Sequence, residues 1–147
     1  FIINGGFGDF YYDYNRDGGH PLVLIAGGIG ITPLISIIRY VDQAHPGVEV
    51  TLMYSAPQPS EFAFLDELQE ISRGNDHIQC VFTTTQSHDT LWKGNVGRID
   101  QALIKKHLPT DKAIFYLCGP PQMLNDLSAS VSDLGVAQSR IRMEQWW

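Results

Sequence analysis

Short apolar runs that suit buried strands alternate with stretches of helical spacing along most of the chain. Strands are predicted at residues 22–26, 48–54, 77–83, 113–118 and 139–144, where apolar residues run together between turn residues. Helices are predicted at 33–44, 61–71, 100–109 and 120–135, where apolar residues recur at steps of three and four. Asp100 is a suitable N-cap for the third helix, and Gly135 is a suitable end for the fourth.

This alternation predicts an α/β fold made of right-handed strand–helix–strand units, with a parallel sheet covered by helices on both faces. Ligands of such sheets bind beyond the carboxyl ends of the strands. The segments to inspect are therefore the loops 27–32, 55–60, 84–97 and 119–122, together with the residues after Glu144. The first 18 residues do not fit the alternation and look like a strand followed by a turn.

Composition and charge narrow the class of protein. The 147 residues suit one domain, and 44% hydrophobic with 18% charged residues is an ordinary globular balance. The net charge of −6 argues against binding of nucleic acid, which needs clustered Lys and Arg. No apolar run approaches the roughly 20 residues of a membrane span, and no secretory leader stands at the start. Two cysteines and five scattered histidines match no metal-binding spacing, so no metal site is predicted.

The stretch LIAGGIGITPL, at the end of the first strand, carries the strongest functional signal. Gly27, Gly28 and Gly30 allow a sharp turn and let a bulky anion approach the backbone. Thr32 is a suitable N-cap, and Pro33 has the backbone angle favoured at the first helical position. A pyrophosphate fits such a helix start. The ordinary dinucleotide fingerprint would require glycine at position 33, so a purely structural turn is the alternative interpretation.

Five motifs occur in one order along the chain: NGGFGDFYY, GGIGITP, KGNVGRID, YLCGPPQM and the terminal EQWW. In this combination the chain resembles the nicotinamide-binding half of the ferredoxin–NADP reductase superfamily, and it is most similar to the oxidoreductase NAD-binding domain-containing proteins. The resemblance implies a five-stranded parallel sheet in the order 3-2-1-4-5. It also implies that residues 1–18 are the C-terminal remnant of a flavin-binding β-barrel and that residues 19–147 form the NAD(P)H-binding domain.

The resemblance also assigns roles to individual residues. Cys118 would lie beside the nicotinamide without acting as a nucleophile, Glu144 would join the polar network near the flavin, and Trp146 would cover the flavin ring. The alternatives are a structural buried cysteine and terminal tryptophans that only cover an apolar surface. The expected cofactor-binding residues are Gly27, Gly28, Gly30, Thr32, Pro33, Tyr54, Ser55, Gly119, Pro120, Gln122, Met123 and Trp147.

The loop after the second strand bears on the choice of nicotinamide cofactor. A 2′-phosphate requires Arg or Lys near the end of that strand. The stretch YSAPQPSEF has no cation and contains Glu61, which favours NADH over NADPH, although Lys93 and Arg98 in a later loop remain alternative sources of charge.

The expected function is therefore delivery of hydride from NAD(P)H to FAD by a flavin-dependent oxidoreductase. The FAD would be held by a flavin domain upstream of this chain, and the chain alone would be inactive. The electron acceptor and the compartment are not determined, although the resemblance is compatible with an intracellular, mitochondrial protein. A non-catalytic regulatory or interaction domain that keeps the fold is the alternative, and a flavodoxin-like carrier is disfavoured because its phosphate loop is absent.

Overall fold

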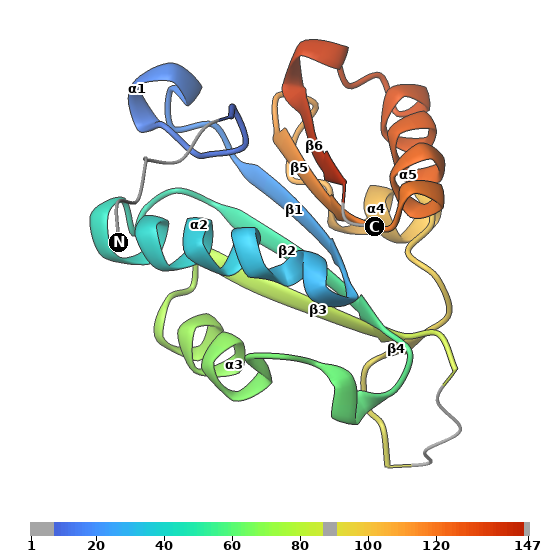
Figure 1. Cartoon of the computed structure of the whole chain (residues 1–147). Helices are drawn as coiled ribbons and strands as arrows, with labels where there is room; N and C mark the ends of the chain where they lie inside the picture. Colours follow the sequence, from blue (N-terminus) through green and yellow to red (C-terminus); the bar gives the residue numbers. More distant parts are fainter. Residues whose placement is uncertain (1–7, 87–90, 146–147) are drawn as a thin grey trace, which may run out of the picture.

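The computed structural model describes residues 8–86 and 91–145. Within them, six parallel strands form one sheet in the order β4-β3-β2-β1-β5-β6 (Figure 1). The strands are β1 Leu22–Gly27, β2 Val50–Ala56, β3 Ile78–Thr84, β4 Asn95–Val96, β5 Ile114–Gly119 and β6 Ile141–Gln145. The helices are α1 Tyr14–Asp17, α2 Ile31–Ala44, α3 Leu65–Gly74, α4 Gln101–His107 and α5 Pro121–Asp133, with 3-10 turns η1 Gly28–Gly30, η2 Pro59–Glu61 and η3 Gln138–Arg140.

The five predicted strands and their order are confirmed, but the predicted count of strands is wrong by one. The additional strand, β4, pairs through Asn95 and Val96 with Thr83 and Thr84 at the edge of the sheet. Gly97 N–H donates to the Thr84 carbonyl at 2.8 Å and closes this pairing. Two residues are too few to show the alternation that identifies a strand in sequence, so β4 exists only because the edge of β3 is available for pairing.

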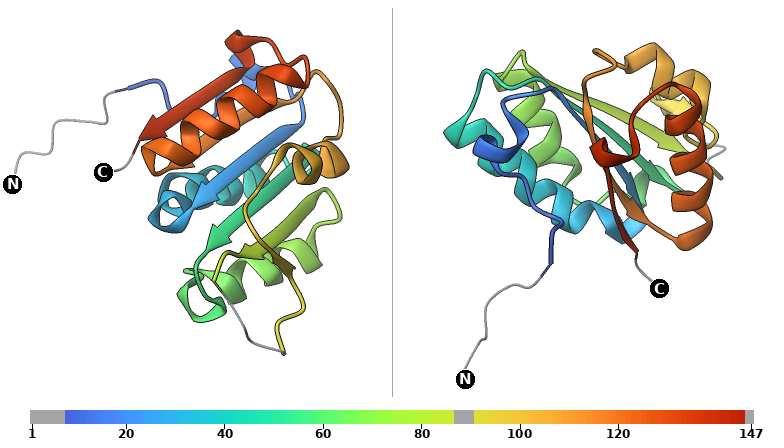
Figure 2. Two further views of the ribbon diagram at one scale, coloured as in Figure 1. Left: turned by 90° about the vertical axis from the view of Figure 1, so that its right-hand side faces the viewer. Right: turned by 90° about the horizontal axis from the view of Figure 1, so that it is seen from above.

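The helices cover both faces of the sheet, with α2 and α3 on one face and α4 and α5 on the other (Figure 2). Successive strand residues point to opposite faces. Leu24 and Tyr116 therefore pack in the core beneath α2, whereas Ile25 and Leu117 pack in the core beneath α5. All six residues of β1 are buried, as expected for a central strand covered on both sides.

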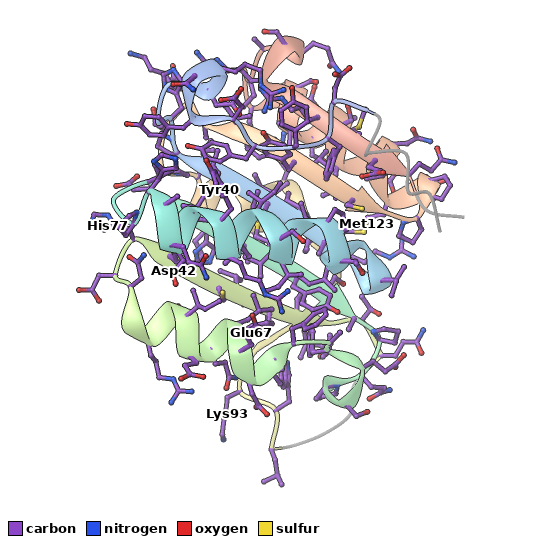
Figure 3. All side chains as sticks on the ribbon, turned by 60° about the vertical axis from the view of Figure 1, so that its left-hand side comes forward. Tyr40, Asp42, Glu67, His77, Lys93 and Met123 are labelled. Carbon is purple, nitrogen blue, oxygen red and sulfur yellow. The ribbon has the colours of Figure 1, made fainter. Side chains whose placement is uncertain are left out.

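The helix predicted from residue 61 begins later than expected, at Leu65. Residues 59–61 form the 3-10 turn η2, and Phe64 has the left-handed φ of 58° at the helix entrance. Phe62 is buried against Tyr54, with the ring centroids 4.9 Å apart, and so the chain turns inward before α3 starts. Polar contacts then join α2 to α3 and to the residue that follows it: Arg39 to Glu67 at 2.6 and 2.8 Å, and Asp42 to Asn75 at 3.0 Å. Figure 3 labels Asp42 and Glu67 on the two helices.

In the described part of the N-terminal segment, residues 8–13 form no strand where one was predicted, and a helical turn, α1, follows them. Asp13 caps α1 by accepting a hydrogen bond from the Asn15 N–H at 2.9 Å, and Gly18, with φ 62°, ends it. This local capping favours a helical turn over an extended strand. The remainder of the predicted strand, residues 1–7, lies outside the described residues.

The carboxylate of Asp17 holds this segment against the sheet. The side chain of Asp17 is buried and contacts Arg142 on β6 at 2.5 and 2.9 Å, Arg16 at 3.0 and 3.2 Å, and the hydroxyl of Tyr116 on β5 at 3.1 Å. Burial by itself would raise the pKa of Asp17, but the hydrogen bonds from Arg142 and Arg16 outweigh it and hold that pKa well below its usual range. The segment after residue 8 is thus an integral part of the packed domain.

Candidate nucleotide-binding site

The glycine turn lies where β1 passes into α2, at the carboxyl edge of the sheet, and its glycines meet different requirements. Gly28 has φ 54°, and the space that a Cβ atom would occupy there is open. A Cβ atom on Gly30 would lie 2.1 Å from the carbonyl oxygen of Cys118, so this residue permits close contact between the turn and β5. The side chain of Met123 packs against Gly27, because its Sδ would lie only 2.4 Å from a Cβ atom at that position.

The start of α2 differs from the prediction. The helix begins at Ile31, with Gly30 in the N-cap position, and no side chain caps it. Thr32 lies inside the first turn, where its hydroxyl donates to the Ile29 carbonyl at 2.8 Å, and Pro33 is the third helical residue rather than the first. The predictions that Thr32 is the N-cap and that Pro33 is the first helical residue are therefore wrong, because η1 carries the turn directly into the helix. An uncapped helix start without acidic residues in its first turn remains suited to an anion.

The end of β5 meets the glycine turn at the same edge. Ala26 and Cys118 are register partners on neighbouring strands, and the Cys118 side chain is fully buried in the core on the α2 side. Gly119 ends the strand, and a Cβ atom there would lie 3.1 Å from Met123 Sδ. Pro120 then provides the extended residue before α5 begins. The glycine turn and the Cys-Gly-Pro stretch, which are far apart in sequence, are thus in contact at the carboxyl edge of the sheet.

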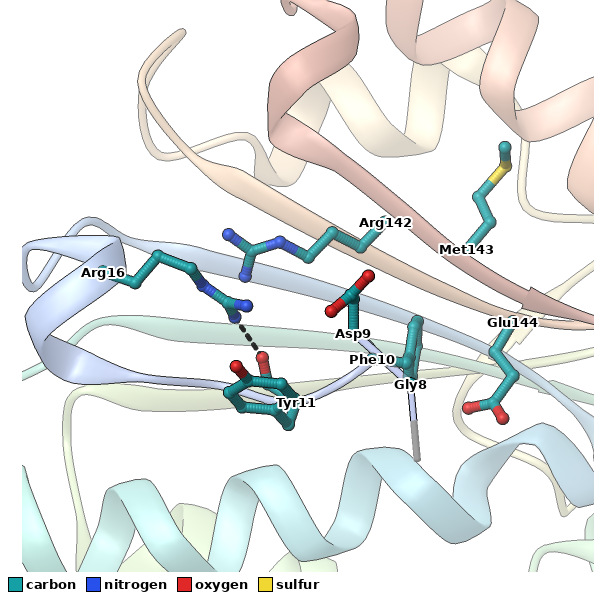
Figure 4. A pocket seen from close by; sticks show the side chains of 8 residues that line it. All are labelled: Gly8, Asp9, Phe10, Tyr11, Arg16, Arg142, Met143 and Glu144. Carbon is teal, nitrogen blue, oxygen red and sulfur yellow. Dashed lines mark hydrogen bonds between the residues drawn. The ribbon is translucent and has the colours of Figure 1, made fainter. Parts of the chain in front are cut away.

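Glu144 is the register partner of Cys118 on β6 and is partly exposed. It lines an open cavity of about 740 Å³ between the N-terminal segment and β6, together with Phe10, Tyr11 and Met143 among others (Figure 4). Arg16 and Arg142 also face this cavity. Trp146 and Trp147, to which cofactor-covering roles were assigned, lie outside the described residues.

A second, smaller cavity of about 250 Å³ lies at the carboxyl ends of β2 and β3 and the start of α5. Four of the predicted cofactor-binding residues line it: Ser55, Pro120, Gln122 and Met123. The lining also includes Thr85, Arg98, Ile99, Asp126 and Leu127, none of which was among the predicted site residues. The sequence offered Arg98 only as an alternative source of charge and gave no signal for Asp126, so the assembled sheet is what places both at this cavity.

Tyr54 is turned away from this edge. Its side chain is buried in the core on the α2 side, and its hydroxyl accepts a hydrogen bond from the Ala63 N–H at 3.2 Å. Burial raises the pKa of Tyr54. The side chain therefore supports the loop after β2 rather than facing the cavity.

Two further findings concern membranes and metals. No helix among the described residues is long and apolar enough to cross a membrane. In the same part of the chain, no cluster of His, Cys, Asp and Glu side chains has the geometry of a metal site.

A glycine turn joined to an uncapped helix at the carboxyl edge of a parallel sheet defines a dinucleotide-binding α/β domain. The sequence matches the oxidoreductase NAD-binding domain family over residues 24–129, and the chain belongs to that family. The resemblance inferred from the motifs is confirmed.

The relatives share most of this chain. Human oxidoreductase NAD-binding domain-containing protein 1 is 34% identical over 158 residues, covering 95% of this chain and 50% of the relative. A flavohemoprotein of Oceanobacillus iheyensis is 30% identical over 142 residues, covering 97% of this chain and 34% of the relative. Among solved structures, an Amycolatopsis cytochrome P450 reductase superposes with a TM-score of 0.84 at 27% identity, over 96% of this chain and 42% of that one. The chain thus spans between about a third and a half of these proteins.

Proposed function

We propose that the chain is the NAD(P)H-binding unit of a flavin-dependent oxidoreductase. Residues 1–18 would continue from a flavin-binding barrel, and residues 19–147 would hold the dinucleotide. When both cofactors are bound, NAD(P)H supplies a hydride that FAD accepts. The observation that carries the proposal is the open, left-handed Gly28 beside the uncapped start of α2, with Gly30 packed on the Cys118 carbonyl. Family membership and the partial coverage of longer relatives support it.

In this proposal the glycine turn binds the diphosphate. Gly28 leaves room for phosphate oxygens to approach the main chain, and the first turn of α2, including Thr32 and Pro33, presents the positive end of a helix dipole. The turn packs against the start of α5 and so would keep its direction: Gly27 and Gly119 contact Met123, and Gly27 also contacts Pro120. Ser55 and Gln122 would contact the adenosine half from the smaller cavity, and Tyr54 would hold the loop behind it.

The edge formed by β5 and β6 would position the nicotinamide. Cys118 and Glu144 are neighbours across the two strands, so the carboxylate stands next to the strand end that carries the Cys-Gly-Pro sequence. Cys118 would lie beside the nicotinamide without blocking it, because its side chain is small, and Glu144 would accept a hydrogen bond near the reacting rings. Trp146 and Trp147 would cover the rings from the chain end. These roles are assigned by the resemblance of the motifs.

The preference for NADH rested on the loop after β2, which contains no cation. Arg98 lines the same cavity as Ser55, so charge is available from another segment. The proposal accordingly names NAD(P)H as the donor.

Binding of dinucleotide to the chain can be measured by titration calorimetry. We expect saturable binding that is lost in Gly28→Val, because a branched side chain would fill the open face and resist the left-handed backbone. Gly135→Val is a matched control, since Gly135 also has positive φ (86°) and open space but follows α5 at a distance from the glycine turn. Unchanged binding in Gly28→Val, or equal loss in both variants, would contradict the proposed phosphate site.

The hydride step can be tested in a protein that joins a flavin domain to this chain. Replacement of Cys118 by a bulkier residue should slow flavin bleaching by NADH or NADPH much more than it weakens dinucleotide binding. Equal loss of rate and affinity would argue against a place for Cys118 beside the nicotinamide. A joined protein that binds dinucleotide and flavin but shows no bleaching would instead favour a regulatory domain.

A further inference from the structure

The outer edge of β3 is only partly covered by other strands. On one side, β2 pairs with β3 along its whole length, from Ile78 to Thr84. On the other side, β4 pairs only with Thr83 and Thr84. Among the described residues, no other strand extends the sheet beyond β3. The side of β3 that faces away from β2 is therefore not paired with a strand from Ile78 to Phe82.

Hydrogen bonds at both ends of β3 show which main-chain groups point to this edge. The His77 carbonyl accepts from a β2 N–H at 2.8 Å, and the Thr85 N–H donates to a β2 carbonyl at 3.1 Å. The odd-numbered residues therefore point their main-chain groups towards β2. The Thr84 carbonyl instead accepts from the Gly97 N–H, beyond β4. Because successive residues of a strand alternate in this respect, the even-numbered residues point their main-chain groups to the free edge.

Side chains cover the two ends of this unpaired part but not its centre. Ser72 Oγ on α3 donates to the Ile78 carbonyl at 2.8 Å, and Asn95 Nδ2 donates to the Phe82 carbonyl at 3.2 Å. The N–H and carbonyl of Cys80 and the N–H of Phe82 have no side-chain partner among the described residues. These three groups point to the place where a further strand would pair.

An open cavity of about 510 Å³ lies along this edge, between α3 and the end of α4. Residues 79–82 of β3 and residues 91–95 are among those that line it. Trp92 is held there because its indole N–H donates to the Asn95 carbonyl at 2.9 Å and its ring stacks on Phe62, with the centroids 5.5 Å apart. Leu91, of which 79% is exposed, adds an apolar side chain. The cavity thus combines unpaired main chain with side chains that an extended peptide could contact.

The charged side chains of this cavity are basic. Lys93 and Lys106 line it, and the described lining contains no Asp or Glu, although the whole chain carries a net charge of −6. Burial and the neighbouring Lys106 lower the pKa of His107, which also lines the cavity and is therefore mainly neutral at pH 7. Glu49 and Asp76 line the adjoining cavity at the amino ends of β2 and β3. Positive charge thus accompanies the unpaired part of β3, and negative charge lies beyond its amino end.

We propose that the free edge of β3 binds an extended, acidic segment of a partner protein, which joins the sheet as a strand. The main-chain groups of Cys80 and Phe82 pair with the segment, and its carboxylates contact Lys93 and Lys106. A second copy of this chain does not suit the edge, because two-fold pairing would bring the lysines of both copies together. The described lining shares no residue with the two cavities assigned to the dinucleotide and the flavin side, so the assignment does not depend on the proposed function.

The test uses a capped hexapeptide that alternates glutamate and valine as the probe. It is titrated into the isotope-labelled whole chain while the amide resonances are followed. Two further versions carry N-methyl groups on alternate amides, one version for each edge of the peptide strand, and a lysine–valine hexapeptide is the charge control. We expect saturable shifts at the Cys80 and Phe82 amides. Only one of the methylated versions should lose binding, because only one edge of an added strand faces β3.

Substitutions of lysine test the electrostatic part of the assignment. Lys93→Gln and Lys106→Gln should each weaken binding of the glutamate peptide about threefold, as for one exposed ion pair, and together about tenfold. Lys105→Gln is the matched control, because Lys105 is the preceding residue on α4, is exposed and does not line the cavity. It removes the same charge and should change the affinity much less.

Several results would overturn the assignment. They are the absence of binding by the glutamate peptide, equal binding of the lysine peptide, the same response to both methylated versions, and equal effects of Lys105→Gln and Lys106→Gln. A dimer of the chain in sedimentation, with the Cys80 and Phe82 amides protected from exchange, would also overturn it, because a second copy would then occupy the edge. Calorimetry with the dinucleotide tests the proposed function independently of these outcomes.

Discussion

Replacement of Gly30 by alanine tests how closely the glycine turn is packed on β5. The new Cβ atom would lie 2.1 Å from the Cys118 carbonyl oxygen and 2.5 Å from the carbonyl carbon. The distance to the oxygen is 1.3 Å shorter than the 3.4 Å at which ordinary contact begins. The obstacle is the main chain of a buried strand paired on both sides, and no side chain can rotate away to relieve the clash. Overpacking of this kind costs about 3 kcal/mol, the upper part of the usual range.

Urea unfolding followed by circular dichroism measures this cost. With a slope of roughly 2 kcal/mol per molar urea, the midpoint of Gly30→Ala should fall by about 1.5 M. Gly28→Ala should lose less, about 1 kcal/mol, because only the left-handed backbone opposes a side chain there. Gly74→Ala, at the end of α3 with open space around it, should be neutral or slightly stabilising. A Gly30→Ala midpoint equal to that of Gly74→Ala would refute the reasoning.

Substitutions at three further residues test other contacts. Asp17→Asn should lower the free energy of unfolding by about 3 kcal/mol at pH 7, because it leaves two guanidinium groups without their carboxylate. The pKa of Asp17 is depressed in the folded state, so its contribution to the free energy of unfolding is fully present above the unfolded pKa near 4 and is lost as the pH falls below it. The urea midpoints of the parent and the variant should therefore converge with acid. A constant difference between the two midpoints would contradict the assignment. Asp100→Ala should cost about 1 kcal/mol through loss of the 2.8 Å cap to the Leu103 N–H, and Asp100→Asn should retain most of that stability in thermal melts. Tyr54→Phe should cost about 1 kcal/mol by removing the acceptor of the Ala63 N–H, and faster amide exchange at Ala63 should accompany it.

Elements that depend on local sequence could be predicted. The runs that became β1, β2 and β5 are almost wholly apolar, and their burial on both faces leaves few alternatives to a central parallel strand. The cap at Asp100 was also predictable, since a short acidic side chain before a helix contacts a backbone N–H three residues ahead. The start of α2 was not, because the choice between Gly30 and Thr32 as N-cap depends on how η1 packs against Cys118.

The sequence by itself determined the succession of strands and helices, the position of the glycine turn and the family, because these depend on residue spacing and on motifs that are contiguous in the chain. Tertiary structure alone decided that Arg98 shares a cavity with Ser55 and that Asp17 is buried against Arg142, 125 residues away. Burial and charge pairing depend on distances in space, and the folded sheet brings together residues that are remote in the chain.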